Sequence, residues 1–155
     1  MLRDNFYIRI FENQDQVPVQ DMVIAGLLAT AEDRNQSVRN GISAYLQRSL
    51  SEDLGNIYDH YLIDGIFFVA ISNERIVGCL GAEKDNDITY RLKRLSVKKE
   101  YRKKGIARKL LHSVEIWAHK RGISKLILGT SEVQKEALIF WKKSGFQVLE
   151  CEVIE

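Results

Sequence analysis

The sequence has little cysteine, little proline and no long hydrophobic run. Its 155 residues include two cysteines and one proline. Cys79 and Cys151 lie far apart and form no metal-binding or redox spacing, so neither a disulfide scaffold nor a thiolate metal site is expected. The apolar run Met22–Ala29 is much shorter than the ~20 residues that a membrane-spanning helix needs. We therefore expect a cytoplasmic protein with no membrane segment and no metal.

The net charge is also low, at +2, and the total charge alone does not indicate a polyanionic partner. Residues 1–155 have the length and apolar content of one compact domain, which buries about 70% of its unfolded surface on folding. Positive charge is concentrated between Lys93 and Lys109. Aromatic residues do not alternate with these charges, so nucleic-acid binding is the less favoured interpretation of this stretch. The sequence is compatible with either a monomer or a homodimer.

Hydrophobic periodicity predicts a mixed α/β fold. Strands are expected at Tyr7–Phe11, Gly65–Ser72, Arg75–Glu83, Asp87–Val97, Lys125–Gly129 and Phe146–Ile154. Helices are expected after Pro18, from Val38 to about Leu54, from Gly105 to Gly122, and from Gln134 to Ser144. No repeat or low-complexity linker interrupts this order.

The fourth predicted strand contains an irregularity. Tyr90 and Leu92 have one parity, whereas Leu95 and Val97 have the other, so the apolar face changes side across Lys93–Arg94. A strand with one buried face cannot change parity unless an extra residue is accommodated, and a β-bulge does this. The sequence therefore predicts a bulge at this point.

A basic turn joins this strand to the next helix. Arg102, Lys103 and Lys104 supply cationic side chains, and Gly105 and Ala107 keep bulk away from the main chain. The start of a helix has unpaired N–H groups and roughly half a positive charge, so it favours an anion such as a diphosphate. The P-loop spacing is absent, which argues against phosphoryl transfer, and so is the dinucleotide fingerprint. A nucleotide-linked cofactor is the predicted ligand, against the alternative of a solvated basic turn.

The turn resembles the acetyl-CoA motif of the GNAT superfamily of N-acetyltransferases, in the form Arg102-x-x-Gly105-x-Ala107. The segment Ala137–Phe146 resembles the C-terminal helix signature of that superfamily, and the similarity extends over residues 49–146. Three segments are similar to the camello-like N-acetyltransferases in particular: Arg94–Val97, Gly105–Ala107 and Thr130–Ala137. The membrane-embedding stretch usual in camello-like proteins is absent. The resemblance implies a GNAT-like fold, with a mixed sheet, a bulged and splayed strand, and flanking helices.

The resemblance also implies that acetyl-CoA, as cosubstrate, lies between the bulged strand and the strand at Lys125–Gly129. The implied cofactor-binding residues are Leu95, Ser96, Val97, Arg102, Lys103, Lys104, Gly105, Ile106, Ala107, Gln134, Ala137, Trp141 and Lys143. The main chain of Leu95–Val97 would bind the pantetheine arm, and the amides of Arg102–Ala107 would bind the pyrophosphate. Gln134 would face the pantetheine, and Lys143 would approach the nucleotide end.

The implied reaction is attack of a neutral amine on a thioester, which needs a donor for the carbonyl oxygen and a way to move protons. The backbone N–H of Leu95 is the candidate donor. Trp141 stands where many relatives have a tyrosine acid, and an indole N–H does not usefully release its proton. A thiol of ordinary pKa ~8.5 can leave as thiolate near neutral pH.

The usual base is also replaced, because Arg91 stands where relatives often have a glutamate. Glu83, Asp87 and His60 are the candidate bases, each of which is equally compatible with a polar surface role. Neither cysteine adjoins an activating histidine in the motifs, so direct transfer is favoured over a covalent enzyme intermediate.

The sequence therefore predicts an N-acetyltransferase that acts on the primary amine of a small molecule or peptide. A degenerate, non-catalytic acyl-CoA-binding regulatory module is the alternative, and Trp141 and Arg91 are compatible with it. The acceptor itself is not specified by any motif.

Overall fold

The computed structural model describes residues 5–29, 34–128 and 135–145. One five-stranded sheet runs through this part of the chain in the order β1-β2-β3-β4-β5. The strands are β1 (Tyr7–Ile10), β2 (Ile66–Ser72), β3 (Arg75–Asn86), β4 (Thr89–Val97) and β5 (Lys125–Leu128). Neighbouring strands are antiparallel except β4 and β5, which are parallel, so the predicted mixed α/β class is confirmed.

Five α-helices accompany the sheet in the described residues. They are α1 (Gln16–Ala29), α2 (Gln36–Ser49), α3 (Ile57–Tyr61), α4 (Ile106–Lys120) and α5 (Lys135–Lys143). A π-helical turn, η2 (Leu50–Leu54), continues α2, and single 3-10 turns precede α1 and α4. None of these helices is long and apolar enough to cross a bilayer. The strand predicted at Phe146–Ile154 lies outside the described residues.

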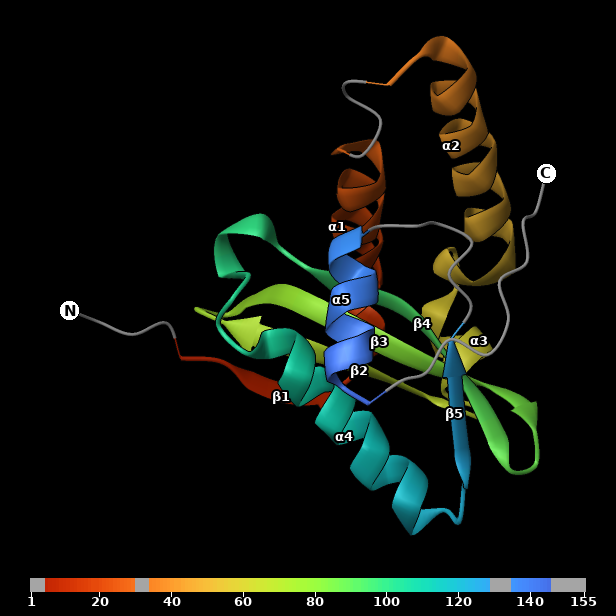
Figure 1. Cartoon of the computed structure of the whole chain (residues 1–155), viewed down its shortest axis with the longest axis vertical. Helices are drawn as coiled ribbons and strands as arrows, with labels where there is room; N and C mark the ends of the chain where they lie inside the picture. Colours follow the sequence, from red (N-terminus) through yellow and green to blue (C-terminus); the bar gives the residue numbers. More distant parts are fainter. Residues whose placement is uncertain (1–4, 30–33, 129–134, 146–155) are drawn as a thin grey trace.

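Helices pack on both faces of the sheet (Figure 1). One apolar cluster joins α1, η2 and α3 to β2 and β3, and Tyr61 and Phe67 lie at its centre with no exposed surface. The second cluster joins α4 and Trp141 of α5 to the opposite face of β2, β3 and β4. The alternation of β2 divides its side chains between the two clusters, so the sheet is buried on both sides.

Two helical features differ from the sequence prediction. The first helix begins at Gln16 rather than after Pro18, because proline is tolerated in the first turn, where its missing N–H has no intrahelical partner. The short helix α3 is not predicted at all. Its five residues are too few for a periodic signal, but Asn56 caps it by accepting a hydrogen bond from the Asp59 amide at 3.4 Å.

The predicted helix α4 is confirmed. It buries an apolar stripe made of Ile106, Leu110, Leu111, Val114 and Ala118. Its N-terminal residue Gly105 has φ +86°, and Gly122, just beyond its end, has φ +71°. Glycine occupies such left-handed positions without a steric cost, which explains why the helix is bounded by these two residues.

The predicted bulge in β4 is also confirmed. Gly81 pairs with Lys93 and Cys79 pairs with Ser96, so two residues of β4, Arg94 and Leu95, face one residue of β3. The extra residue restores the apolar face: side chains on both sides of the bulge pack against the α4 cluster. A β-bulge therefore causes the change of apolar parity across Lys93–Arg94, as the sequence predicts.

Candidate functional site

The described pairings of β4 differ on its two sides. With β5 they run to Leu92 and Leu128, the last described residue of β5, whereas with β3 they continue to Val97. Within the described part of the chain, the edge of β4 from Lys93 to Val97 therefore has no partner strand on the β5 side. Such an edge presents main-chain N–H and C=O groups to a ligand. The residues Leu95–Val97, whose main chain is predicted to bind the pantetheine arm, lie on this edge.

The basic turn follows this edge directly. Arg102, Lys103, Lys104 and Gly105 are exposed, and the Arg102 Nε donates a hydrogen bond to the Val97 carbonyl at 3.2 Å. No side chain caps the start of α4. The first amides of a helix have no intrahelical acceptor, so this end of α4 favours a bound anion.

The two small residues of the turn contribute main chain rather than side chain. A Cβ at Gly105 would meet nothing within 4 Å, so open space surrounds this residue. The side chain of Ile106 is 2% exposed and belongs to the core, which leaves only its amide for a ligand. Ala107 is partly buried. The edge of β4 and the start of α4 are joined by the 3-10 turn Lys99–Tyr101, and the amides of Lys98, Tyr101 and Arg102 donate to carbonyls of the chain itself.

A hollow of about 430 Å³ lies between α4 and α5. Three cations, Arg108, Lys109 and Lys143, line it together with Leu111, His112, Ser144 and one carboxylate, Glu115. The excess of positive charge suits a phosphorylated group. Lys143, expected near the nucleotide end of the cofactor, therefore lies beside the first turns of α4.

The other predicted cofactor-binding residues of the C-terminal motif are Trp141, Ala137 and Gln134. Trp141 is 6% exposed and packs in the α4 cluster, with its ring centroid 5.1 Å from that of Phe140. Its indole is a core group in this structure. Ala137 lies in α5, and Gln134 lies outside the described residues.

Two of the three candidate bases are in contact. His60 Nε2 lies 2.6 Å from Glu83 Oε2, which joins α3 to β3. The other oxygen of Glu83 lies 3.6 Å from Lys93 Nζ. Asp87 is not part of this group: it lies in the turn between β3 and β4, its side chain is 94% exposed, and it pairs with Lys84 at 3.1 Å. The structure thus assembles a His60–Glu83 dyad and separates Asp87 from it.

A buried ion pair, not predicted from the sequence, lies beside this dyad. Arg94, the bulge residue, donates to both carboxylate oxygens of Asp53 in η2, at 2.7 and 2.8 Å. The Tyr61 hydroxyl donates to the same carboxylate at 2.6 Å, and Arg94 Nη1 donates to Tyr45 Oη at 3.0 Å. The side chains of Arg94 and Asp53 are 6% and 0% exposed. We refer to these four residues as the Arg94 network.

The Arg94 network controls the ionisation of Asp53. Burial raises the pKa of Asp53, but hydrogen bonds from Arg94 and Tyr61 and the charge of Arg94 outweigh it, so the pKa lies below its usual value. Burial and the neighbouring Asp53 charge raise the pKa of Tyr61 well above its usual value, so the phenol stays a hydrogen-bond donor.

Acid is therefore expected to weaken the fold through Asp53. Because the pKa is lower in the folded state, the stabilisation is present above the ordinary value of ~3.9 and is lost as the pH falls through the folded-state pKa. The expected result is a fall in melting temperature below about pH 4 that is shallower in Asp53→Asn. Thermal unfolding followed by circular dichroism between pH 2 and 7 measures both slopes. Equal slopes would contradict the low pKa.

Cys79 lies beneath the bulge, and its thiol is unreactive at neutral pH. Its Sγ donates to the Arg94 carbonyl at 3.1 Å, and burial raises the pKa of the thiol to about 12. A thiol in this state is not a nucleophile at neutral pH. Among the described side chains, no group of three or more His, Cys, Asp or Glu residues is arranged to hold a metal.

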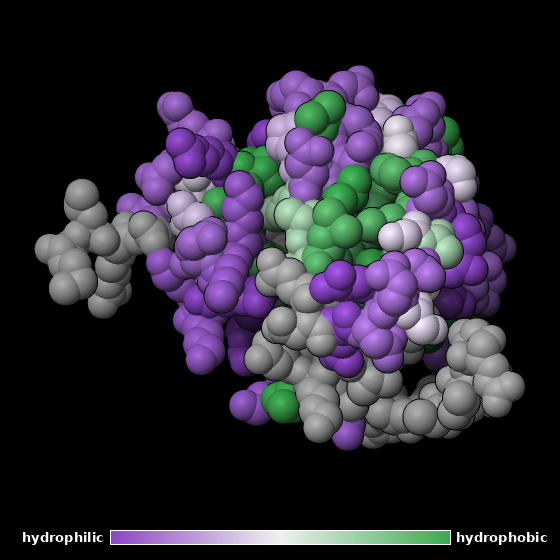
Figure 2. Space-filling view, turned by 90° about the horizontal axis from the view of Figure 1, so that it is seen from above, coloured by the Kyte–Doolittle hydropathy of each residue, from purple (hydrophilic) through white to green (hydrophobic). Residues whose placement is uncertain are grey.

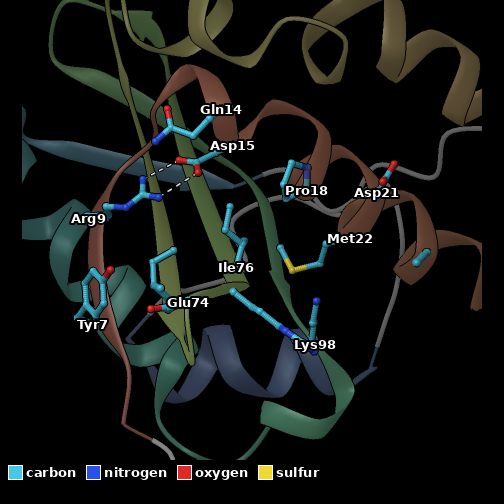
Figure 3. A pocket seen from close by; sticks show the side chains of 13 residues that line it. Tyr7, Arg9, Gln14, Asp15, Pro18, Asp21, Met22, Glu74, Ile76 and Lys98 are labelled. Atoms are coloured by element: carbon cyan, nitrogen blue, oxygen red, sulfur yellow. Dashed lines mark hydrogen bonds and ion pairs between the residues drawn. The ribbon is translucent and has the colours of Figure 1, made fainter.

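A second hollow, of about 730 Å³, lies between α1, β1 and the turn that joins β2 to β3 (Figure 3). It is lined by β1, α1, the turn between β2 and β3, and Lys98. Its central charges, Arg9 and Asp15, already bind each other at 2.6 and 3.0 Å. None of the predicted cofactor-binding or base residues lines this hollow, so its volume does not identify it as the site.

The upper ends of α1 and α2 border an exposed apolar area (Figure 2). Leu28 near the end of α1 is 50% exposed, and Val38 near the start of α2 is 40% exposed. Helix α1 also contacts β4, and a Cβ at Gly26 would lie 3.9 Å from Ser96 Oγ. Helix α1 therefore flanks β4 near Ser96, on the face opposite α4.

Comparison with known proteins gives a consistent result. The family model described as acetyltransferase (GNAT) domain matches residues 64–148. N-acetyltransferase 8 of Homo sapiens is 36% identical over 110 residues, which cover 66% of this chain and 48% of that protein. A probable N-acetyltransferase camello of Xenopus tropicalis is 31% identical over 111 residues, covering 69% and 51%. The chain spans about half the length of these curated relatives.

Solved structures share the fold. The PaiA N-acetyltransferase of Thermoplasma acidophilum, solved in complex with coenzyme A, superposes with a TM-score of 0.81 at 22% identity. The alignment covers 96% of this chain and 93% of that one. The predicted GNAT-like architecture is thereby confirmed.

Proposed function

The chain belongs to the acetyltransferase (GNAT) family, and on that premise we propose that it transfers an acetyl group from acetyl-CoA to a primary amine. The amine, from a small molecule or a peptide, attacks the thioester directly in a ternary complex. The observation that carries the proposal is the open edge of β4 running into the uncapped start of α4. Coenzyme A carries a thioester-bearing arm followed by a diphosphate. The arm would bind along the edge of β4, and the diphosphate would bind at the start of α4.

The described residues fit coenzyme A. The main chain of Leu95–Val97 would hold the pantetheine arm, because strand edges bind extended chains by main-chain hydrogen bonds. Of the amides of Arg102–Ala107, that of Arg102 already donates to the Lys99 carbonyl at 3.3 Å, so the remaining amides and the exposed cations of the turn would hold the diphosphate. The basic hollow beside Lys143 would hold the phosphorylated nucleotide end.

The reaction balances without any other reactant. The amine nitrogen forms a bond to the thioester carbonyl carbon, the carbon–sulfur bond breaks, and the amine proton passes to a base. Charge that builds on the carbonyl oxygen would be stabilised by a backbone N–H, for which Leu95 is the candidate. Holding both reactants together supplies several kcal/mol through orientation alone.

The His60–Glu83 dyad is the proposed base. A histidine whose second partner is a carboxylate can accept a proton and remain oriented, as in other acyl-transfer sites. The dyad lies beside the Arg94 network, because the rings of His60 and Tyr61 are 4.7 Å apart between centroids. Trp141 is a core residue, so the sulfur would leave as thiolate and take its proton afterwards.

Two measurements test the proposal. Calorimetry should detect binding of coenzyme A and acetyl-CoA to the purified protein. Release of free thiol from acetyl-CoA should then depend on an amine when a panel of amino acids, polyamines and peptides is screened. Binding without release over the whole panel would favour the non-catalytic acyl-CoA-binding module, and absence of binding would overturn both.

A further inference from the structure

We propose that the buried pair of Arg94 and Asp53 fixes the β4 bulge in its left-handed conformation and thereby keeps the coenzyme-facing edge of β4 open. Both are positioning residues, since neither needs to touch the reacting atoms. The proposal rests on the proposed function in one respect: it takes coenzyme A as the ligand of that edge.

The backbone of Arg94 is unusual. Its φ is +65°, a left-handed conformation that is sterically costly for a residue with a Cβ. The sheet has two further register shifts, one beside Ala70 and Ile71 and one between Lys84 and Asn86. Of the described residues at these three irregularities, only Arg94 has a positive φ. A cost of this kind persists only where the surroundings impose the conformation.

The side chain of Arg94 supplies that constraint. Its guanidinium is held by both oxygens of Asp53 and by Tyr45, and its carbonyl accepts from Cys79. Hydrogen bonds thus hold both the main chain and the side chain of Arg94. A planar, bidentate pair fixes orientation as well as distance, which a lysine at this position would not do.

Overall stability alone does not explain this arrangement. Taking two charges out of water is costly, and apolar residues of similar volume are often as stabilising as a buried ion pair. The pair is found at the β4 bulge, just beyond the last described pairing of β4 with β5, and Asp53 comes from a π-helical turn, a feature frequent at functional sites. An ion pair fixes the backbone geometry at the bulge, which apolar packing would not do.

The same network positions the proposed base. Tyr61, which donates to Asp53, follows His60 in α3, and Lys93, which contacts Glu83, precedes Arg94 in β4. The rings of His60 and Tyr61 lie 4.7 Å apart between centroids. A change in the position of Arg94 would therefore move the open edge and the dyad together.

A matched pair of double variants tests the proposal. Asp53→Asn with Arg94→Gly and Asp53→Asn with Arg94→Ala both remove the two charges and the guanidinium. They differ in backbone preference, because glycine adopts a positive φ freely and alanine does not. We expect the glycine variant to bind coenzyme A within about threefold of the wild type, and the alanine variant to bind about tenfold more weakly or worse. Calorimetry on material with a cooperative melting transition measures both affinities.

Equal coenzyme affinity in the two variants, whether near the wild-type value or weak, would overturn the proposal, since the backbone at position 94 would then not be the controlling element. Hydrogen exchange at the amides of Leu95 and Ser96 gives a second readout that needs no ligand. Faster exchange in the alanine variant than in the glycine variant is expected, and equal exchange counts against the proposal. If the wild type fails to bind coenzyme A, the proposed function fails, while hydrogen exchange still decides whether Arg94 holds the bulge.

Discussion

Replacing Gly105 with aspartate is expected to weaken coenzyme A binding by about two powers of ten. The residue begins α4, and a Cβ there meets nothing within 4 Å, so the new carboxylate has room beside the first helical amides. It would occupy the region that favours an anion and repel the diphosphate. Loss of about two charge-assisted hydrogen bonds, each worth roughly 1.5–3 kcal/mol, accounts for a change of this size. Calorimetric titration with coenzyme A measures it.

Gly122→Asp is the matched control. Gly122 lies just beyond the other end of the same helix, also has a positive φ, at +71°, and also has open space around its Cβ position. The backbone strain of the two substitutions is therefore similar, but Gly122→Asp places its charge at the C-terminal end of α4, away from the proposed diphosphate site. G122D should bind coenzyme A like the wild type. If G105D loses no more affinity than G122D, the diphosphate does not lie at the start of α4.

The parts of the fold that the sequence predicts well depend on short-range rules. The bulge follows from the opposite parity of Leu92 and Leu95, because side chains alternate strictly along a strand. The extent of α4 follows from an apolar stripe between two glycines. Arg102 and Gly105 are recognisable as a turn at a helix start, since capping and turn chemistry act over a few residues.

The Arg94 network could not be predicted in the same way. Arg94 and Asp53 are 41 residues apart, and in sequence each is a charged residue of the kind that usually faces water. The bulge turns Arg94 toward the helices, and η2 places Asp53 opposite it. Neither the position of Arg94 nor that of Asp53 produces a periodic hydrophobic pattern in the sequence. Helix α3, which contains Tyr61, is too short to produce one. A charged residue at the predicted parity change is the only signal that could have drawn attention to it.

The candidate bases are an intermediate case. His60, Glu83 and Asp87 are all plausible by residue type, but their positions depend on how α3 packs on β3. His60 and Glu83 are 23 residues apart and meet because α3 crosses the strand, whereas Asp87 extends into the hairpin turn. Tertiary packing therefore selects two of three candidates that local sequence treats alike.

The second large effect is expected from Glu83→Gln. Glutamine keeps the shape of the side chain and can still contact His60, but it cannot stabilise a protonated imidazole as a carboxylate does. General base catalysis contributes typically 10²–10⁴-fold, so kcat with the best amine of the panel should fall by about a hundredfold or more. Coenzyme A affinity should stay unchanged, because β3 meets the start of α4 at Gly78, beside Ile106, whereas Glu83 lies further along the strand against His60. Initial rates of thiol release give kcat, and calorimetry gives the affinity.

Comparison with two further variants shows whether the dyad acts as a unit. His60→Gln should lower kcat to a similar extent, and the double variant should cost little more than either single one, since residues that act together are non-additive. Asp87→Asn removes the third candidate carboxylate, whose side chain is 94% exposed and contacts Lys84, and it should leave kcat near the wild-type value. An equal loss in D87N and E83Q, or additive losses in the double variant, would show that proton transfer does not pass through His60 and Glu83. Because each substitution is read against unchanged coenzyme affinity, a loss of kcat reports on the amine side of the reaction.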